Sequence, residues 1–313
     1  MREVDPAAWD GLVEELGVAD AYLRRAYIES ACVLESGRPL LLEHDGTVFA
    51  AIERENPVDV VTPYGYGGPV GGDLAAFWPA YEEWCGERGV LTTFVRFHPL
   101  YGNQRGAPFR VETLAPTIGW RLGQNDLLAG IHWKHRNKVR KAVAAGVVVT
   151  AAEGLGDFVP LYEHTMQRAG AAPFYFFAPA YWNALERLGG GLVRFDAAQG
   201  DETVASALCL ASLPWLHYHL SATAEAGRAT GAMTLLLLEA GRWAQERGYE
   251  RFHLGGGLGG RRDSLHHFKH RFDSGGECEA AIGKAVHDSE AYRAAGGDPD
   301  DLSGFFPTYR RAH

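Results

Sequence analysis

The stretch WAQERGYERFH, at residues 243–253, has a partial copy in the first half of the chain. Residues 84–89 read WCGERG and residues 243–248 read WAQERG, and each is followed by a strand-like run that contains Arg-Phe-His. Each copy stands at the end of a predicted strand–loop–helix–strand unit. A repeat shared by two units of the same order is typical of an internal duplication. The sequence therefore predicts two α/β domains of the same fold.

Length and composition set the class of protein. The chain has 313 residues, enough for two ordinary domains, and 46% hydrophobic residues, typical of a globular protein with a real core. A net charge of -9 argues against a general nucleic-acid binder, whose whole surface would be basic, but leaves room for one local basic patch. The four cysteines are far apart without a CxxC pair, which fits a reduced compartment. Without a signal peptide or an apolar run of spanning length, we expect a cytoplasmic protein with no transmembrane segment.

Local patterns predict the elements of both halves. In the first half, residues 7–35 and 74–88 read as helical, and residues 38–54 read as a β-hairpin turning at Asp45-Gly46. Residues 58–62 and 90–97 read as strands, and residues 62–69 form a Gly/Tyr-rich loop. In the second half, residues 147–152 and 215–221 read as strands and residues 158–169 and 231–247 as helices. Residues 222–230 read as a loop, and residues 255–260 as a glycine loop. Between the halves, residues 131–142 read as a helix.

That helix, IHWKHRNKVRKA, carries five positive charges between Lys134 and Lys141. Helical spacing places Trp133, Arg136, Asn137 and Arg140 on one side. A charge run is usually a solvated face. Here the cations are concentrated in an otherwise acidic chain, so we favour a patch for phosphate or a polyanionic substrate.

The glycine run GGGLGG at residues 255–260 precedes Asp263 and the pair Phe268-Lys269. It matches GxGxxG, but no apolar helix begins within it, so a dinucleotide fold is not favoured. Glycines let backbone N–H groups approach a ligand closely, and a lysine beyond the loop can serve a phosphate or an oxyanion. A flexible loop followed by a solvated basic turn is the alternative.

Three other motifs are weaker. Arg228 and Gly231 fit the acyl-CoA pyrophosphate loop Q/R-x-x-G-x-G/A, whereas Met233 does not. His217 and His219 share one strand face with Trp215, opposite Tyr218, but no metal-ligand spacing accompanies the histidines, so no metal is expected. Ser221 lies outside any GxSxG elbow, which disfavours a serine hydrolase.

In this order the motifs resemble the FemABX family of tandem-GNAT aminoacyltransferases and its smaller FemAB-like relatives. The residues that carry the resemblance are TPYGYGGP (62–69), RFHP (96–99), RNKVRKA (136–142), YHLS (218–221), LGGG (254–257), FK (268–269) and FFPTYR (305–310). They span the chain from about residue 60 to residue 310. The long heptad run of the coiled-coil arm in many peptidoglycan-bridge enzymes is missing.

The resemblance implies two tandem GNAT-like domains, each a mixed, mostly antiparallel sheet flanked by helices. We expect the first at residues 1–145, with residues 286–313 returning to it, and the second at residues 146–285. The implied reaction is amide formation, in which an aminoacyl group passes from tRNA to an amine of a cell-wall precursor, peptide or saccharide. Lys269, with Phe268, would stabilise charge on the attacked carbonyl. The expected substrate-binding residues are Tyr64, Tyr66, Arg96, His98, Arg136, Asn137, Lys138, Arg140, Lys141, Tyr218, His219, Ser221, Gly255, Gly256, Gly257 and Asp263.

Two alternatives stay open. One is an acyl-CoA-dependent GNAT N-acyltransferase, in which Arg228 and Gly231 hold CoA. The other is a non-catalytic duplicated binding module, against which the intact Phe268-Lys269 pair counts. In either transferase the co-substrate is aminoacyl-tRNA or acyl-CoA. No tightly bound cofactor and no DNA partner are expected.

Overall fold

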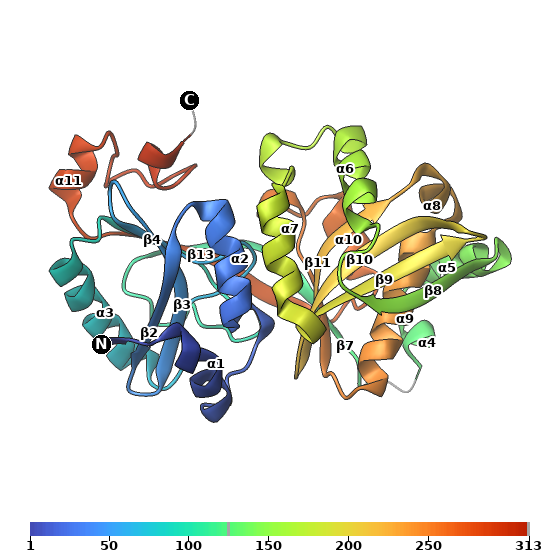
Figure 1. The fold of residues 1–313 in the computed structure, drawn as a ribbon, viewed down its shortest axis with the longest axis horizontal. Helices are drawn as coiled ribbons and strands as arrows, with labels where there is room; N and C mark the ends of the chain where they lie inside the picture. The colour runs from blue at the N-terminus through green and yellow to red at the C-terminus, as the bar shows by residue number, and fades with distance from the viewer. Residues whose placement is uncertain (124–125, 312–313) are drawn as a thin grey trace. The chain divides into compact units, whose positions relative to one another are not determined.

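The computed structural model describes residues 1–123 and 126–311 (Figure 1). The chain forms two compact units, unit 1 from Met1–Leu114 and Glu279–His313 and unit 2 from Ala115–Cys278. The first division falls after Leu114 rather than after residue 145, because β7 (Arg110–Arg121) continues into unit 2 and pairs there with β12 (Arg251–Gly255). The second falls after Cys278 rather than after residue 285, because β13 (Glu277–Val286) pairs with β6 (Thr92–Arg96).

Unit 1 is a mostly antiparallel sheet in which one pair of strands is parallel. Its strand order is β1 (Arg2–Glu3), β2 (Arg38–His44), β3 (Thr47–Arg54), β4 (Asp59–Val61), β6 and β13, with β5 (Val70–Gly71) beside β3. The parallel pair is β4 with β6. Its helices are α1 (Pro6–Glu15), α2 (Arg25–Glu35), α3 (Leu74–Arg88) and α11 (Ser289–Ala294).

Both faces of the unit 1 sheet are apolar because alternate strand residues point to opposite sides. Leu40, Phe49 and Val60 pack with α3, whereas Leu41, Val48 and Val61 pack with α1 and α2. Figure 1 shows α2 and α3 on opposite sides of β2 and β3. The unit therefore has helix, sheet and helix layers.

One predicted helical region of unit 1 is divided. Residues 7–35 form two helices, α1 and α2, with a short 3₁₀ helix at Ala21–Leu23 between them. Gly17 adopts a φ of 66°, and the Asp20 side chain accepts a hydrogen bond from the Tyr22 amide. A left-handed residue and a new N-cap interrupt a helix even where apolar spacing continues.

Unit 2 has a similar sheet. Its strand order is β7, β12, β11 (Trp215–Thr223), β10 (Glu202–Ser212), β9 (Leu192–Gln199) and β8 (Val147–Glu153). The helices are α4 (Leu127–Gly130), α5 (Trp133–Ala144), α6 (Phe158–Ala169), α7 (Pro179–Leu185), α8 (Glu225–Thr230), α9 (Ala232–Glu246) and α10 (Ser264–His270). The expected loop at residues 222–230 thus contains a helix, α8. Figure 1 shows α6 in front of the sheet and α9 behind it.

The WxxERG repeat marks the same place in both units. Helix α3 connects the parallel strands β4 and β6, and α9 connects the parallel strands β11 and β12. At each helix end the arginine lies over the tryptophan ring, with Arg88 5.2 Å from the Trp84 centroid and Arg247 4.3 Å from that of Trp243. The repeat therefore belongs to one strand–helix–strand unit that occurs twice.

The second half of the repeat does not mark equivalent positions. Both strands begin at the third residue after the helix-ending glycine, at Thr92 in β6 and Arg251 in β12. The Arg-Phe-His triplet therefore opens β12, whereas Arg96 closes β6. Structurally, Gly255 and not Arg251 corresponds to Arg96.

Glycines inside the two matched helices are predicted to respond differently to alanine. A Cβ on Gly241 in α9 would lie 2.7 Å from Trp120, whereas a Cβ on Gly86 in α3 would meet nothing within 4 Å. Gly241→Ala should destabilise the protein by about 1–3 kcal/mol through overpacking. Gly86→Ala should stabilise it by about 0.5–1 kcal/mol through helix propensity. Urea unfolding measures both, and equal effects would contradict the packing.

Candidate active site in the second unit

The parallel strands β11 and β12 diverge partway along their length. They pair from Trp215 with Arg251 to His217 with His253. Beyond that point β11 continues on β10 and β12 continues on β7. Each strand has a register shift where the two part, beside His219 in β11 and between His253 and Gly255 in β12. Such bulges bend a strand and redirect its side chains, so the strand ends separate here.

Lys269 lies between these diverging ends. Its side chain comes from α10 and is buried. Its Nζ donates a hydrogen bond of 2.8 Å to the carbonyl oxygen of Gly256, just after β12. The same atom lies 5.5 Å from the ring centroid of Tyr218 on β11. The lysine thus contacts both strands where their pairing has stopped.

Burial lowers the pKa of Lys269 to about 8, while the Asp263 carboxylate acts in the opposite direction. At neutral pH the side chain is therefore mostly an ammonium ion. An ammonium has three N–H donors, and Gly256 takes one of them. A buried cation with donors to spare is suited to an oxygen that gains negative charge during a reaction.

The glycine loop and Asp263 position the helix that carries Lys269. The Asp263 carboxylate accepts hydrogen bonds from the amides of His266, at 2.8 Å, and Leu258, at 3.0 Å. These bonds, chiefly that from His266, lower the pKa of Asp263. A Cβ on Gly257 would lie 2.3 Å from this carboxylate. Asp263, expected to bind substrate, is engaged as the N-cap of α10.

His135 fixes the other side of Phe268 and was not singled out from the sequence. Its Nε2 donates to the Phe268 carbonyl at 2.9 Å, and its ring lies 4.5 Å from that of Phe272. Burial lowers the pKa of His135 to about 4, so the ring is neutral at pH 7. The helical spacing of His135, Val139 and Ala142 could have predicted that His135 lies on the buried side of the basic helix.

The outer side of α5 is basic. Asn137, Lys138, Arg140 and Lys141 are exposed and Arg136 is half-buried. Within residues 1–123 and 126–311, no carboxylate forms an ion pair with any of the five cations from Lys134 to Lys141. Lys138 lies over the Phe268 ring, 5.7 Å from its centroid, so this face adjoins the helix of Lys269.

Two residues of the basic helix serve local structure. Arg136 donates to the carbonyls of Ile131, at 2.6 Å, and Ala129, at 3.1 Å, where α4 ends. Arg140 donates to the Asn137 side chain at 2.8 Å. Both stay on the exposed side of the helix, as their spacing predicts.

The remaining side chains expected to bind substrate in the second domain belong to β11. Tyr218 hydrogen-bonds Ser221, and burial raises its pKa. His219 lies 2.9 Å from the Tyr181 hydroxyl, and burial lowers its pKa to about 3. His219 is the extra residue of the β11 bulge, which sequence alternation alone does not reveal.

The two residues expected to hold CoA lie at the junction of α8 and α9. Arg228 is exposed on α8, 3.6 Å from Glu225. Gly231 has a φ of 82° where α9 begins, and a Cβ there would lie 3.2 Å from that of Lys138. Helix α5 therefore packs closely against the start of α9.

Tyr64, Tyr66, Arg96 and His98 belong to unit 1 and are described there alone. The Tyr66 and His98 rings lie 6.0 Å apart, and the Tyr64 carbonyl accepts a hydrogen bond from the Tyr27 hydroxyl. Arg96 donates at 2.9 Å to the carbonyl of Thr62, where the Gly/Tyr-rich loop begins. Within this unit the four residues shape one loop and its support.

Neighbouring glycines of the second unit test the role of Asp263. A Cβ on Gly257 would lie 2.1 Å from the Arg261 carbonyl, whereas a Cβ on Gly256 would lie 3.5 Å from its nearest neighbour, in Thr117. Gly257→Ala should displace Asp263, remove the cap of α10 and lower stability by about 1 kcal/mol or more. Gly256→Ala should change it little. Thermal unfolding compares them, and equal losses would contradict this role.

Comparison with known proteins identifies a domain within the second unit. Residues 133–269 match the family model described as an acetyltransferase (GNAT) domain. No curated protein sequence matches the chain significantly. Among the described residues, no helix is long and apolar enough to cross a membrane.

Solved structures resemble the whole chain. A structure of FemX has a TM-score of 0.67 at 15% identity, covering 94% of this chain and 98% of its own. The structure of L-PGS from Bacillus licheniformis has a TM-score of 0.63 at 14% identity, covering 90% and 92%. At these identities the likeness is one of fold. The chain has the Fem-like tandem GNAT fold that its motifs predict.

Proposed function

We propose that this protein is an acyltransferase that forms an amide, with the acyl carbonyl held between the diverging ends of β11 and β12. The observation that carries the proposal is Lys269, a buried cation that contacts both strand ends. The GNAT match over residues 133–269 includes this place and supports the reaction class.

The chemistry needs little covalent participation by the protein. A free amine attacks the activated carbonyl, a C–N bond forms, and the carbonyl oxygen gains negative charge. The C–O bond of an ester, or the C–S bond of a thioester, then breaks, and the proton lost by the amine balances the charge of the leaving group. Lys269 stabilises the oxyanion, and positioning of the two partners supplies much of the rate.

Aminoacyl-tRNA is the proposed donor, and the acceptor is an amine of a cell-wall precursor, peptide or saccharide. The likeness to FemX and L-PGS supports aminoacyl transfer to a component of the cell envelope. The cations of α5, which form no ion pair with a carboxylate among the described residues, lie on the helix that contacts Phe268 and suit the phosphates of a polyanionic donor. Tyr64, Tyr66, Arg96 and His98 of unit 1 are proposed to bind the acceptor.

Acyl-CoA is the second candidate donor, because the matched family model is an acetyltransferase domain. Arg228 and Gly231 would then hold its phosphates at the start of α9. Met233 departs from the motif, and α5 lies close to Gly231. Both observations favour the tRNA donor.

The role of Lys269 sets the direction of the pH dependence. Because its pKa is lowered to about 8, the ammonium form declines as pH rises through that value. An oxyanion-stabilising lysine predicts that kcat falls across this range, and that Lys269→Met lowers kcat by about 10²–10³ while removing this pH dependence. Single-turnover rates from pH 6 to 9 measure both. A rate that rises through pH 8 would make the lysine a base instead.

Heat stabilisation separates the two donors. Charged tRNA should raise the Tm of the protein, more at low salt than at high salt. The double substitution Lys134→Gln and Lys141→Gln should weaken this effect, and Arg228→Gln should leave it unchanged. Stabilisation by CoA alone, lost in Arg228→Gln, would replace the tRNA donor by acyl-CoA.

A further inference from the structure

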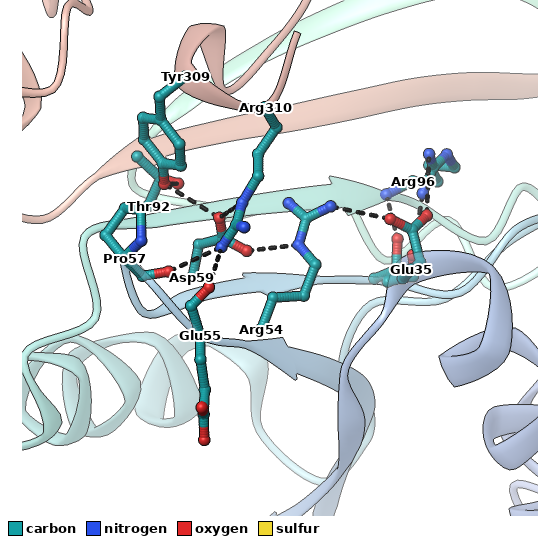
Figure 2. Close-up of polar contacts among 10 residues, drawn as sticks. Glu35, Arg54, Glu55, Pro57, Asp59, Thr92, Arg96, Tyr309 and Arg310 are labelled. Carbon is teal, nitrogen blue, oxygen red and sulfur yellow. Dashed lines mark hydrogen bonds and ion pairs between the residues drawn. The ribbon is translucent and has the colours of Figure 1, made fainter. Parts of the chain in front are cut away.

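The C-terminal segment of unit 1 binds a buried carboxylate, that of Asp59. Asp59, in β4, is fully buried, and its two oxygens accept hydrogen bonds from three side chains. Arg54 donates at 2.6 Å, Arg310 at 2.8 Å and the Tyr309 hydroxyl at 3.1 Å (Figure 2). Two of these three donors therefore come from the last residues of the described chain. A buried charge persists only when it is compensated in this way.

The same segment is held at other points. Arg310 Nη2 donates to the carbonyls of Glu55 and Pro57, each at 2.8 Å. The Tyr309 hydroxyl lies 2.7 Å from that of Thr92 on β6. Upstream, the buried Lys284 donates to the Leu302 carbonyl at 2.6 Å, and Phe306 joins a small apolar core. The segment is thus firmly docked on unit 1.

From Asp59 a chain of alternating charges leads to the Gly/Tyr-rich loop. Arg54 also donates to Glu35 at 2.8 Å, and Glu35 lies 3.9 Å from Arg96 (Figure 2). Arg96 donates from its side chain to the Thr62 carbonyl, and its amide donates at 2.8 Å to the Thr62 hydroxyl. Burial lowers the pKa of Arg96, and Glu35 opposes that shift. Glu35 therefore lies beside the guanidinium that holds Thr62.

We propose that Arg310 and Tyr309 are positioning residues that hold the loop at residues 62–66 through Asp59, Arg54, Glu35 and Arg96. The proposal rests on the proposed function only where it takes this loop to bind the acceptor. Without Arg310, the Asp59 oxygen that Arg310 shares with Tyr309 loses its charged donor, and the Arg54 fork turns toward both oxygens, since arginine binds carboxylates in a bidentate manner. Arg54 then leaves Glu35, so that carboxylate is no longer held in place beside Arg96, and Arg96 is held less firmly at Thr62.

Hydrogen–deuterium exchange of the full-length protein tests this chain of contacts. Arg310→Ala should speed exchange at residues 62–66 and 302–310 by about tenfold. Glu35→Gln, which interrupts the chain midway, should speed exchange at residues 62–66 and leave residues 302–310 at the wild-type rate. Arg310→Lys keeps a charge for Asp59 and should restore part of the protection. Arg293→Ala removes an exposed pair with Asp300, 3.2 Å away, and should not affect residues 62–66.

Two results would overturn the proposal. One is faster exchange in Arg310→Ala confined to residues 302–310, because the segment would then hold only itself. The second is a wild-type exchange rate at residues 62–66 in Glu35→Gln. This variant decides the question if Arg310→Ala loosens the whole of unit 1. No substrate enters the measurement, so its failure is distinct from a failure of the Lys269 pH prediction.

Discussion

The parallel pairing of β11 and β12 stops after His217 and His253, and the proposed chemistry depends on that interruption. A fully paired sheet would have no room for a side chain between neighbouring strands. Because the strands part, Lys269 reaches the Gly256 carbonyl on one side and the Tyr218 ring on the other. The burial that follows lowers the pKa of the lysine to about 8. The position of the Lys269 side chain and its lowered pKa are thus two consequences of one break in strand pairing.

The helix that carries Lys269 is held from both ends. Asp263 caps its start, and His135 of α5 binds the Phe268 carbonyl near its end. Neither residue has to touch a substrate to matter, because a rigid helix keeps the ammonium within hydrogen-bond reach of a reacting oxygen. The unsubstituted α-carbon of Gly257 leaves space for the Asp263 carboxylate.

The two units use their cations differently. In unit 1, Arg54, Arg96 and Arg310 alternate with Asp59 and Glu35, so each cation lies beside a carboxylate. On α5 of unit 2 the cations have no carboxylate partners among the described residues. Compensated charges order a structure, whereas uncompensated ones attract a mobile anion. This contrast separates the proposed positioning network from the proposed phosphate-binding surface.

Periodicity and helix-ending glycines were enough to predict α3 and α6 at their observed bounds, and WxxERG was enough to predict a duplicated fold. These signals are local or repeated, so the sequence carries them directly. Two predictions of secondary structure were wrong. One continuous helical region was expected where α1 and α2 are separate helices, and a loop was expected where α8 forms.

The amino-acid sequence by itself determined the fold class and the basic α5, and it singled out Lys269 as a candidate catalytic residue. Only the tertiary structure decided what surrounds them. The bond from His135 to Phe268 spans 133 positions and that from Arg310 to Asp59 spans 251. Partners so far apart leave no periodic signal in one sequence, because the sheet and not the chain brings them together. Asp263 is a different case, because the amides that it binds belong to His266 and Leu258, only three and five positions away. There the sequence interpretation missed a short helix and its N-cap, not a distant partner.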